Sequence, residues 1–188
     1  PDNAAPPRWN LKDLYASPDS PLLAADAGRA ASGATAFAAH YAGKIALLSP
    51  KQLAQALHEY EALASTIARV ESYLELKQAE NLLDNQAQIC AGKLSKPLSQ
   101  ARQELIFFEL ELLQSPDAHF QQLLLDPALA PWAGWLQRIR AHAPHSLNID
   151  VEKILAARAP VWQQPWQELH AQLLAATMVV IDGQPYSL

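Results

Sequence analysis

The stretch that decides the fold runs from Lys51 to Gln114 and reads KQLAQALHEYEALASTIARVESYLELKQAENLLDNQAQICAGKLSKPLSQARQELIFFELELLQ. It holds two segments with the same apolar rhythm, separated by a short polar stretch at residues 81–85. Successive apolar residues are three or four positions apart, which places them on one face of an α-helix. The two rows are Leu53, Ala56, Tyr60, Leu63, Ile67, Val70 and Leu74, and Ala87, Ala91, Leu94, Leu98, Ala101, Leu105, Phe108 and Leu112. Two such rows joined by a reversal predict a long antiparallel helical hairpin over residues 51–114.

Two local signals refine the hairpin. Pro97 lies inside the second segment, yet the apolar row keeps its phase on both sides, so we expect one kinked helix. Proline in a helix interior costs about 3 kcal/mol, which packing along the row must outweigh. At the start of the first helix, Ser49, Pro50 and Gln52 have the spacing of a capping box with proline at the first helical position.

Helical signals continue on both sides of the hairpin. A helix is predicted from about Leu22 to Tyr41, and the apolar residues expected to share its buried face are Ala30, Ala34, Phe37, Ala38, Tyr41 and Ile45. Ser115-Pro116 and Asp126-Pro127 each predict a capped short helix. The second of these leads into the apolar face of Trp132, Trp135, Leu136 and Ile139.

The C-terminal third predicts two more helices and a hairpin. Asn148 is a candidate cap for a helix that Ala159-Pro160 should end, and Trp162 and Trp166 should belong to the last helix. Residues 178–188 change to β-branched apolar residues around an Asp-Gly turn, which predicts a short β-hairpin at the boundary of a longer protein.

Composition agrees with a helical protein. Half of the 188 residues are hydrophobic while only 7% are aromatic, and alanine, leucine and glutamine are abundant. We therefore predict an all-α multi-helix bundle, with residues 1–188 as a single domain. Residues 1–20, which concentrate Trp9, Leu11, Leu14 and Tyr15, are predicted to form an extended clasp over the helices.

The charge and the apolar windows argue against two classes of partner. The net charge is −5, from 14 basic and 19 acidic residues without a basic cluster, so nucleic acid is not an expected partner. The apolar windows are too short to cross a bilayer. The sequence does not begin with a charged region followed by an apolar core, so no signal peptide is predicted. The single cysteine, Cys90, excludes an intrachain disulfide and fits a reducing, cytoplasmic location.

We searched for catalytic patterns and found none complete. His58-Glu59 begins a His-Glu-x-x-His zinc motif, but Ala62 stands at the second ligand position. His142 and His145 have metal-binding spacing but no third ligand close in sequence. Cys90 lies within an apolar row and is interpreted as a small buried hydrophobe. The sequence therefore predicts no catalytic, cofactor-binding or metal-ligating residue in this chain.

The acidic residues of the hairpin are predicted to lie on its solvent-exposed faces and not in a site. They fall at helical spacing between the apolar rows and were expected to form solvated faces. They are Glu59, Glu61, Glu71, Glu75, Glu104, Glu109 and Glu111.

An ordered series of loose motifs resembles a known family. The series comprises Arg8-Trp9-Asn10-Leu11-Lys12-Asp13-Leu14-Tyr15, Phe37-x-x-x-Tyr41-x-Gly43-Lys44-Ile45-Ala46-x-Leu48, Leu57-x-x-Tyr60-Glu61-x-Leu63, Phe107-Phe108-Glu109-Leu110-Glu111-Leu112 and Ser146-Leu147-x-x-x-Val151-Glu152-x-Ile154-Leu155. It is similar to the N-terminal region of the oligoendopeptidase F family, zinc metallopeptidases that cleave short peptides. The family's zinc ligands and catalytic glutamate have no counterparts in this chain.

The resemblance implies a role for the whole chain. It would be a mostly helical, non-catalytic domain that walls one side of a channel for oligopeptides and packs, through its helical hairpin, on a catalytic domain missing from this chain. Zinc would belong to the parent enzyme. The alternatives are a stand-alone helical interaction module, which the regular apolar rows also allow, and an independent enzyme built on the loop histidines, which lacks a ligand set.

Overall fold

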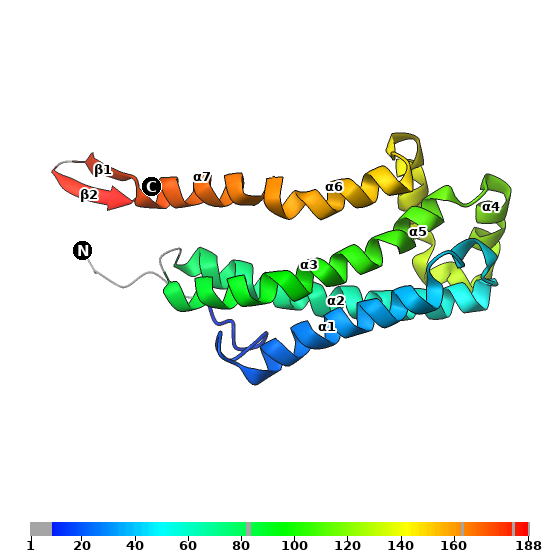
Figure 1. Ribbon diagram of the computed structural model, residues 1–188, viewed down its shortest axis with the longest axis horizontal. Helices are drawn as coiled ribbons and strands as arrows, with labels where there is room; N and C mark the ends of the chain where they lie inside the picture. Colours follow the sequence, from blue (N-terminus) through cyan, green and yellow to red (C-terminus); the bar gives the residue numbers. More distant parts are fainter. Residues whose placement is uncertain (1–8, 82–83, 163, 182, 188) are drawn as a thin grey trace.

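The computed structural model describes residues 9–81, 84–162, 164–181 and 183–187. The elements, in chain order, are α1 (Pro21–Tyr41), η1 (Ile45–Leu47), α2 (Pro50–Glu80), α3 (Asn85–Gln114), α4 (Asp117–Leu125), η2 (Pro127–Trp132), α5 (Ala133–His142), η3 (Ala143–His145), α6 (Ile149–Trp162), α7 (Gln164–Ala176), β1 (Met178–Ile181) and β2 (Gln184–Ser187). Figure 1 shows the long helices α1, α2 and α3 lying side by side, with α6 and α7 following one another along the opposite side. The predicted all-α multi-helix bundle is confirmed.

The predicted helical hairpin is present as α2 and α3. Their 31 and 30 residues give helices about 45 Å long. Most members of the two predicted rows are buried, and Tyr60, Leu63, Ala91 and Leu94 are half-buried against the same core. Pro97 lies inside an unbroken α3, as the constant phase of the row predicted.

Helix α1 packs against both helices of the hairpin, and most extensively against α3. α3 packs more extensively against α1 than against α2. The reason lies in the small residues of α1, because Ala27, Ala30 and Ala34 are buried and allow a close approach. At Gly33 a Cβ atom would lie only 2.6 Å from Cδ2 of Leu63, so α1 and α2 meet where one helix has no side chain.

An aromatic group fills the middle of this core. The ring of Phe37 in α1 lies 5.8 Å from Phe107 and 5.3 Å from Phe108, centroid to centroid. Tyr60 of α2 stacks on Phe108 at 4.7 Å and approaches Trp135 of α5 at 6.0 Å. Rings from four helices therefore meet at one place, which holds α5 against the three long helices.

The ends of the hairpin helices are set by their caps. Ser49 accepts a hydrogen bond from the Gln52 N–H while the Gln52 side chain accepts one from the Ser49 N–H at 3.0 Å, so the predicted capping box is present. Asp84 begins α3 by accepting bonds from the N–H groups of Gln86 and Ala87. Residues 82–83 of the reversal between the helices lie outside the described residues.

Two predicted helix boundaries are wrong. Ser115 does not cap α4, because its hydroxyl donates to the Glu111 carbonyl at the end of α3, 3.1 Å away. Pro160 does not end α6, which continues to Trp162. A proline removes the hydrogen bond to the carbonyl four residues earlier and crowds that carbonyl, but a helix can continue past it, as α3 also does at Pro97. Asp126 does cap η2, as predicted.

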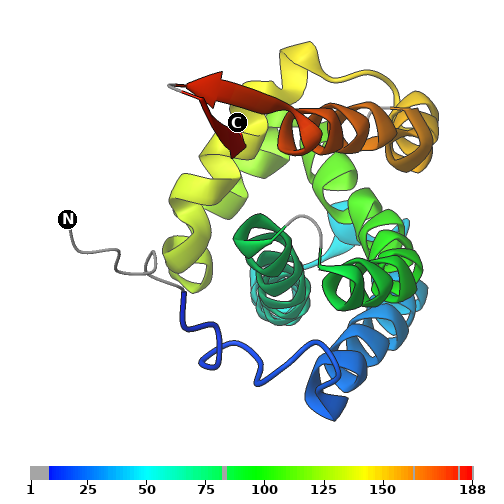
Figure 2. The ribbon, with the colours of Figure 1, turned by 90° about the vertical axis from the view of Figure 1, so that its left-hand side faces the viewer.

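The clasp, residues 9–20, runs across the lower side of α2 before entering α1 (Figure 2). Tyr15 is its anchor, with a side chain that is only 2% exposed. The Tyr15 ring meets the Tyr73 ring of α2 edge to face at 5.3 Å. The predicted clasp residues before Trp9 lie outside the described residues.

We call α1 to α5 together with the clasp the body, and residues 147–162, 164–181 and 183–187 the C-terminal arm. α6 packs on α3, whereas the main contacts of α7 are with α6 and β2. β1 and β2 pair antiparallel, with Met178 opposite Ser187 and Ile181 opposite Gln184, so the predicted β-hairpin forms. Gly183 supplies the positive φ of 78° that this tight turn needs.

Candidate functional site

The incomplete zinc motif of the sequence lies on the surface of α2. The ring of His58 is exposed and meets Trp132 edge to face, with 4.5 Å between ring centroids. Glu59 accepts a hydrogen bond from Gln55 at 2.8 Å and lies beside Tyr41, whose pKa is raised by burial and by this carboxylate. Both side chains are thus engaged in contacts between neighbouring elements.

The loop histidines are exposed at the end of α5 and in η3, and no metal partner joins them. Across the part of the chain that the structure describes, no group of three or more His, Cys, Asp or Glu side chains could hold a metal ion. The family resemblance assigns zinc to the parent enzyme, and the described residues of this chain offer no ligand set for it.

Cys90 has the surroundings of a structural cysteine. Its Sγ lies 3.2 Å from the Pro18 carbonyl oxygen, to which the thiol donates, and the side chain is half-buried. Burial raises the pKa of the thiol, and the charge of Asp19 raises it further. Because the thiolate is the nucleophilic form, this environment disfavours reactivity.

The expectation of solvated acidic faces is wrong for three residues of the hairpin. The Glu109 carboxylate accepts a bond of 2.7 Å from the Tyr60 hydroxyl, and the pKa of Tyr60 is strongly raised by burial and by this bond. Glu71 pairs with Arg102 across α2 and α3. Glu111 accepts bonds from the N–H groups of the loop after α1.

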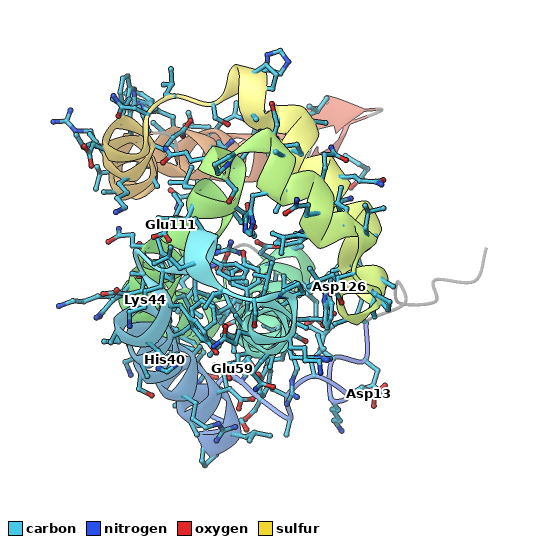
Figure 3. The ribbon with its side chains drawn as sticks, turned by 90° about the vertical axis from the view of Figure 1, so that its right-hand side faces the viewer. Asp13, His40, Lys44, Glu59, Glu111 and Asp126 are labelled. Carbon is cyan, nitrogen blue, oxygen red and sulfur yellow. The ribbon has the colours of Figure 1, made fainter. Side chains whose placement is uncertain are left out.

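The Glu111 contact fixes the end of the body at which α6 begins (Figure 3). Its two oxygens lie 2.7 Å from the Gly43 nitrogen and 3.3 Å from the Ile45 nitrogen. Gly43 has a φ of 77°, a conformation that favours glycine and turns its N–H toward α3. No spacing in the sequence joins positions 43 and 111, so only the packing of α1 on α3 reveals this contact.

A buried carboxylate anchors the clasp. Asp26 of α1 is 4% exposed and accepts a 2.8 Å bond from the Tyr15 hydroxyl. Arg29 pairs with the same carboxylate, and Arg69 of α2 approaches it at 3.4 Å while its guanidinium lies 4.8 Å from the centre of the Tyr15 ring. Burial, followed by the bond to Asp26, raises the pKa of Tyr15 to about 12.

A small hollow lies between the clasp and α2. Its volume is about 260 Å³, and Trp9, Leu11, Tyr15, Tyr73, Lys77 and Glu80 are among the residues that line it. Lys77 and Glu80 pair with each other at 2.6 Å on one side. Lys12 also lines the hollow, so its charged side chains are Lys12 and the paired Lys77 and Glu80.

The feature that stands out is the apolar surface of the C-terminal arm. Among the described residues, thirteen of the eighteen exposed large apolar side chains belong to the arm, and none of its described side chains is buried. They are Leu147, Val151, Ile154, Leu155, Val161, Trp162, Trp166, Leu169, Leu173, Leu174, Met178, Val179 and Val180. Large contiguous apolar surfaces on soluble proteins mark sites of interaction. The arm is therefore the candidate functional site.

Helical spacing orders these side chains. We call six of them the apolar row, with Val151, Leu155 and Trp162 in α6 and Trp166, Leu169 and Leu173 in α7. Within each helix they are three, four or seven residues apart, so they follow one face. The two tryptophans are 64% and 69% exposed. Asn148 begins α6 by accepting a bond of 2.9 Å from the Val151 N–H, and Glu152 accepts one from Leu147.

The two helices of the arm, but not its β-hairpin, lie within the part of the chain that matches a known family. Residues 111–177 match the family model of oligopeptidase F. The predicted resemblance to the oligoendopeptidase F family is confirmed over these residues. The oligopeptidase F match begins at the end of α3 and includes both helices of the arm, whereas α1 and α2 lie outside it. These residues are part of a peptidase-associated domain.

A solved structure supports the fold over nearly the whole chain. The crystal structure of a "putative peptidase" from Chlamydophila abortus aligns with a TM-score of 0.61 at 18% sequence identity. The alignment covers 96% of this chain but 31% of that one, so the chain spans about a third of the length of its structural neighbour. No curated protein matches the chain.

One further observation concerns the type of surface. Among the described residues, no helix combines the length and the hydropathy needed to cross a membrane. The exposed apolar side chains of the arm are grouped along faces of helices that also carry charged residues, such as Lys153 and Arg158. In α6 the apolar face is interrupted by Arg158, which lies three residues after Leu155 and four before Trp162, whereas α7 is the more clearly amphipathic helix of the arm.

Proposed function

We propose that this chain is the non-catalytic N-terminal domain of an oligoendopeptidase F-like zinc metallopeptidase, and that it walls one side of a channel for short peptides. The observation that carries the proposal is the coincidence of the oligopeptidase F match with the arm. The match covers residues 111–146, which contribute to the core of the body, and also α6 and α7, which this chain leaves largely exposed.

The shape of the body suits the role of a wall. Three helices, two of them about 45 Å long, lie side by side and are held by a continuous core from Tyr15 to Ile139. Rigid walls limit access by size, so an extended oligopeptide could enter a channel that excludes a folded protein. The catalytic glutamate and zinc ligands of the parent enzyme would lie outside residues 1–188.

The test compares this chain with the complete protein encoded by its reading frame. We expect the complete protein to cleave short fluorogenic peptides, to lose this activity with a zinc chelator, and to leave a folded substrate protein intact. The 188-residue chain should cleave none of them. Stoichiometric zinc binding by the 188-residue chain, or a complete protein without peptide hydrolysis, would contradict the proposal.

The second candidate is a stand-alone helical interaction module, which the exposed apolar arm also favours. The two functions differ in what the 188-residue chain does alone. A module that dimerises through its arm should sediment as a tight dimer at low micromolar concentration. A peptidase domain that lacks its neighbour should sediment as a monomer.

A further inference from the structure

The apolar row of the arm is exposed in this chain. The main contacts of α7 are with α6 and β2, and every large side chain of the row remains between 37% and 69% exposed. At a rise of 1.5 Å per residue, the row extends about 17 Å along α6 and about 11 Å along α7. A surface of this length requires an extended partner.

The hairpin at the end of the arm brings the backbone back toward this row. β2 runs antiparallel to β1 and contacts α7, so Ser187 lies opposite Met178, next to the end of α7. Figure 1 shows β2 running back alongside β1 toward α7. A segment that followed Leu188 would therefore start next to the apolar row.

The structural neighbour indicates how much chain could provide that segment. Its chain is about three times as long as the part that this chain covers. The oligopeptidase F match includes the whole row from Val151 to Leu173, although none of the row belongs to the core of this chain. The apolar side chains of the arm are therefore available for contact with a segment outside the body.

We propose that, in the complete protein, the apolar row is covered by the polypeptide segment that follows Leu188. The contact is intramolecular, and it places the interface with the remaining protein on α6 and α7 rather than on the α2–α3 hairpin. This inference rests on the proposed function, because it requires a longer protein, and it specifies which surface of the domain meets the rest.

The experiment compares variants in two forms of the protein, the 188-residue chain and the complete protein. The double variant Trp166→Ser/Leu169→Ser removes the centre of the row. The matched control Leu125→Ser changes a side chain that is 84% exposed at the end of α4, in the body. The readout is hydrogen exchange of the peptides that cover residues 149–176, measured by mass spectrometry.

We expect the arm to exchange at least about tenfold more slowly in the complete protein than in the 188-residue chain, because burial of the row stabilises both helices. The double variant should remove most of this protection in the complete protein and change little in the 188-residue chain. Leu125→Ser should leave the exchange of residues 149–176 unchanged in both forms.

Three results would overturn the inference. They are equal exchange of the arm in both forms, a complete protein that ends at Leu188, and a dimer of the 188-residue chain that the double variant separates into monomers. The last would assign the row to a second copy. Peptide hydrolysis, measured on the same complete protein, separates the two proposals: protection without hydrolysis contradicts the proposed function alone, and hydrolysis without protection contradicts this inference alone.

Discussion

The body and the C-terminal arm use similar residues in opposite ways. In the body, the apolar faces of α1, α2 and α3 meet each other, and large side chains such as Phe108 and Leu112 are fully buried. In the arm, an equally regular row that includes Trp162 and Trp166 stays exposed. The difference teaches that helical periodicity specifies which face of a helix is apolar, whereas the neighbouring elements decide whether that face is buried.

The largest expected effect comes from comparing two alanine substitutions, one in the body and one in the arm, in the 188-residue chain. Phe108→Ala should lower the free energy of unfolding by about 3–5 kcal/mol, because it leaves a cavity in the aromatic group of the core. Trp166→Ala should change it by about 0.5 kcal/mol or less, because that side chain is already in contact with water. Urea denaturation followed by circular dichroism measures both. Equal losses for the two variants would show that the arm is part of the core.

The second prediction concerns the buried carboxylate of the body. Asp26→Asn removes the charge that binds Arg29, Arg69 and the Tyr15 hydroxyl, and should cost about 2–3 kcal/mol of stability. Asp13→Asn, at an exposed position of the clasp, should cost almost nothing. Limited proteolysis of the clasp should accelerate in the first variant and not in the second. A clasp that stays resistant in Asp26→Asn would mean that Tyr15 is held by packing alone.

The third prediction is a pH dependence from the same contact. The pKa of Tyr15 is raised to about 12 in the folded protein, chiefly by burial, while an unfolded tyrosine titrates near 10. The unfolded chain therefore loses this proton first as pH rises, which favours unfolding. The resulting contribution of about 3 kcal/mol is present below pH 10 and is lost as pH rises from about 10 to 12.

The control for this titration is Tyr15→Phe, which lacks the ionisable group. The stability difference between the two proteins should shrink over the same pH range, as measured by urea denaturation at each pH. Because Tyr60 and other tyrosines also titrate in alkali, only this difference reports on Tyr15. A difference that stays constant between pH 9 and pH 12 would show that the Tyr15 pKa is ordinary.

The smallest expected effect compares two glycines of α1. At Gly28 a Cβ would meet nothing within 4 Å, so Gly28→Ala should stabilise the protein by about 1 kcal/mol through helix propensity alone. At Gly33 the new Cβ would meet Leu63 at 2.6 Å, so Gly33→Ala should gain less, since Leu63 must move. Thermal denaturation ranks the two. An equal gain would mean that Leu63 rotates away without cost.

Sequence reasoning recovered much of the fold because the signals were local. The capping box at Ser49 and Gln52, the caps at Asp126 and Asn148, and the unbroken helix through Pro97 all depend on residues a few positions apart. The misplaced end of α6 at Pro160 was also a local judgement. It failed because proline disfavours a helix without always ending it, and α6 continues past Pro160 as α3 continues past Pro97.

The candidate site was harder to predict than the fold. The apolar spacing of Trp162, Trp166, Leu169 and Leu173 was evident and was interpreted as helix, but nothing in the spacing distinguishes a buried face from an exposed one. Likewise, Glu111 was expected to face solvent and instead binds the backbone at Gly43 and Ile45. Contacts between positions so far apart leave no periodic trace in a single sequence.

By itself, the sequence determined the helices, their apolar faces and most of their ends, because propensity, capping and periodicity act within a few residues. Only the tertiary structure decided that α1 packs closely on α3, that Asp26 holds the clasp, and that the apolar row of the arm stays exposed. These outcomes depend on which surfaces meet, and that is settled by shape and burial between distant segments rather than by any local preference.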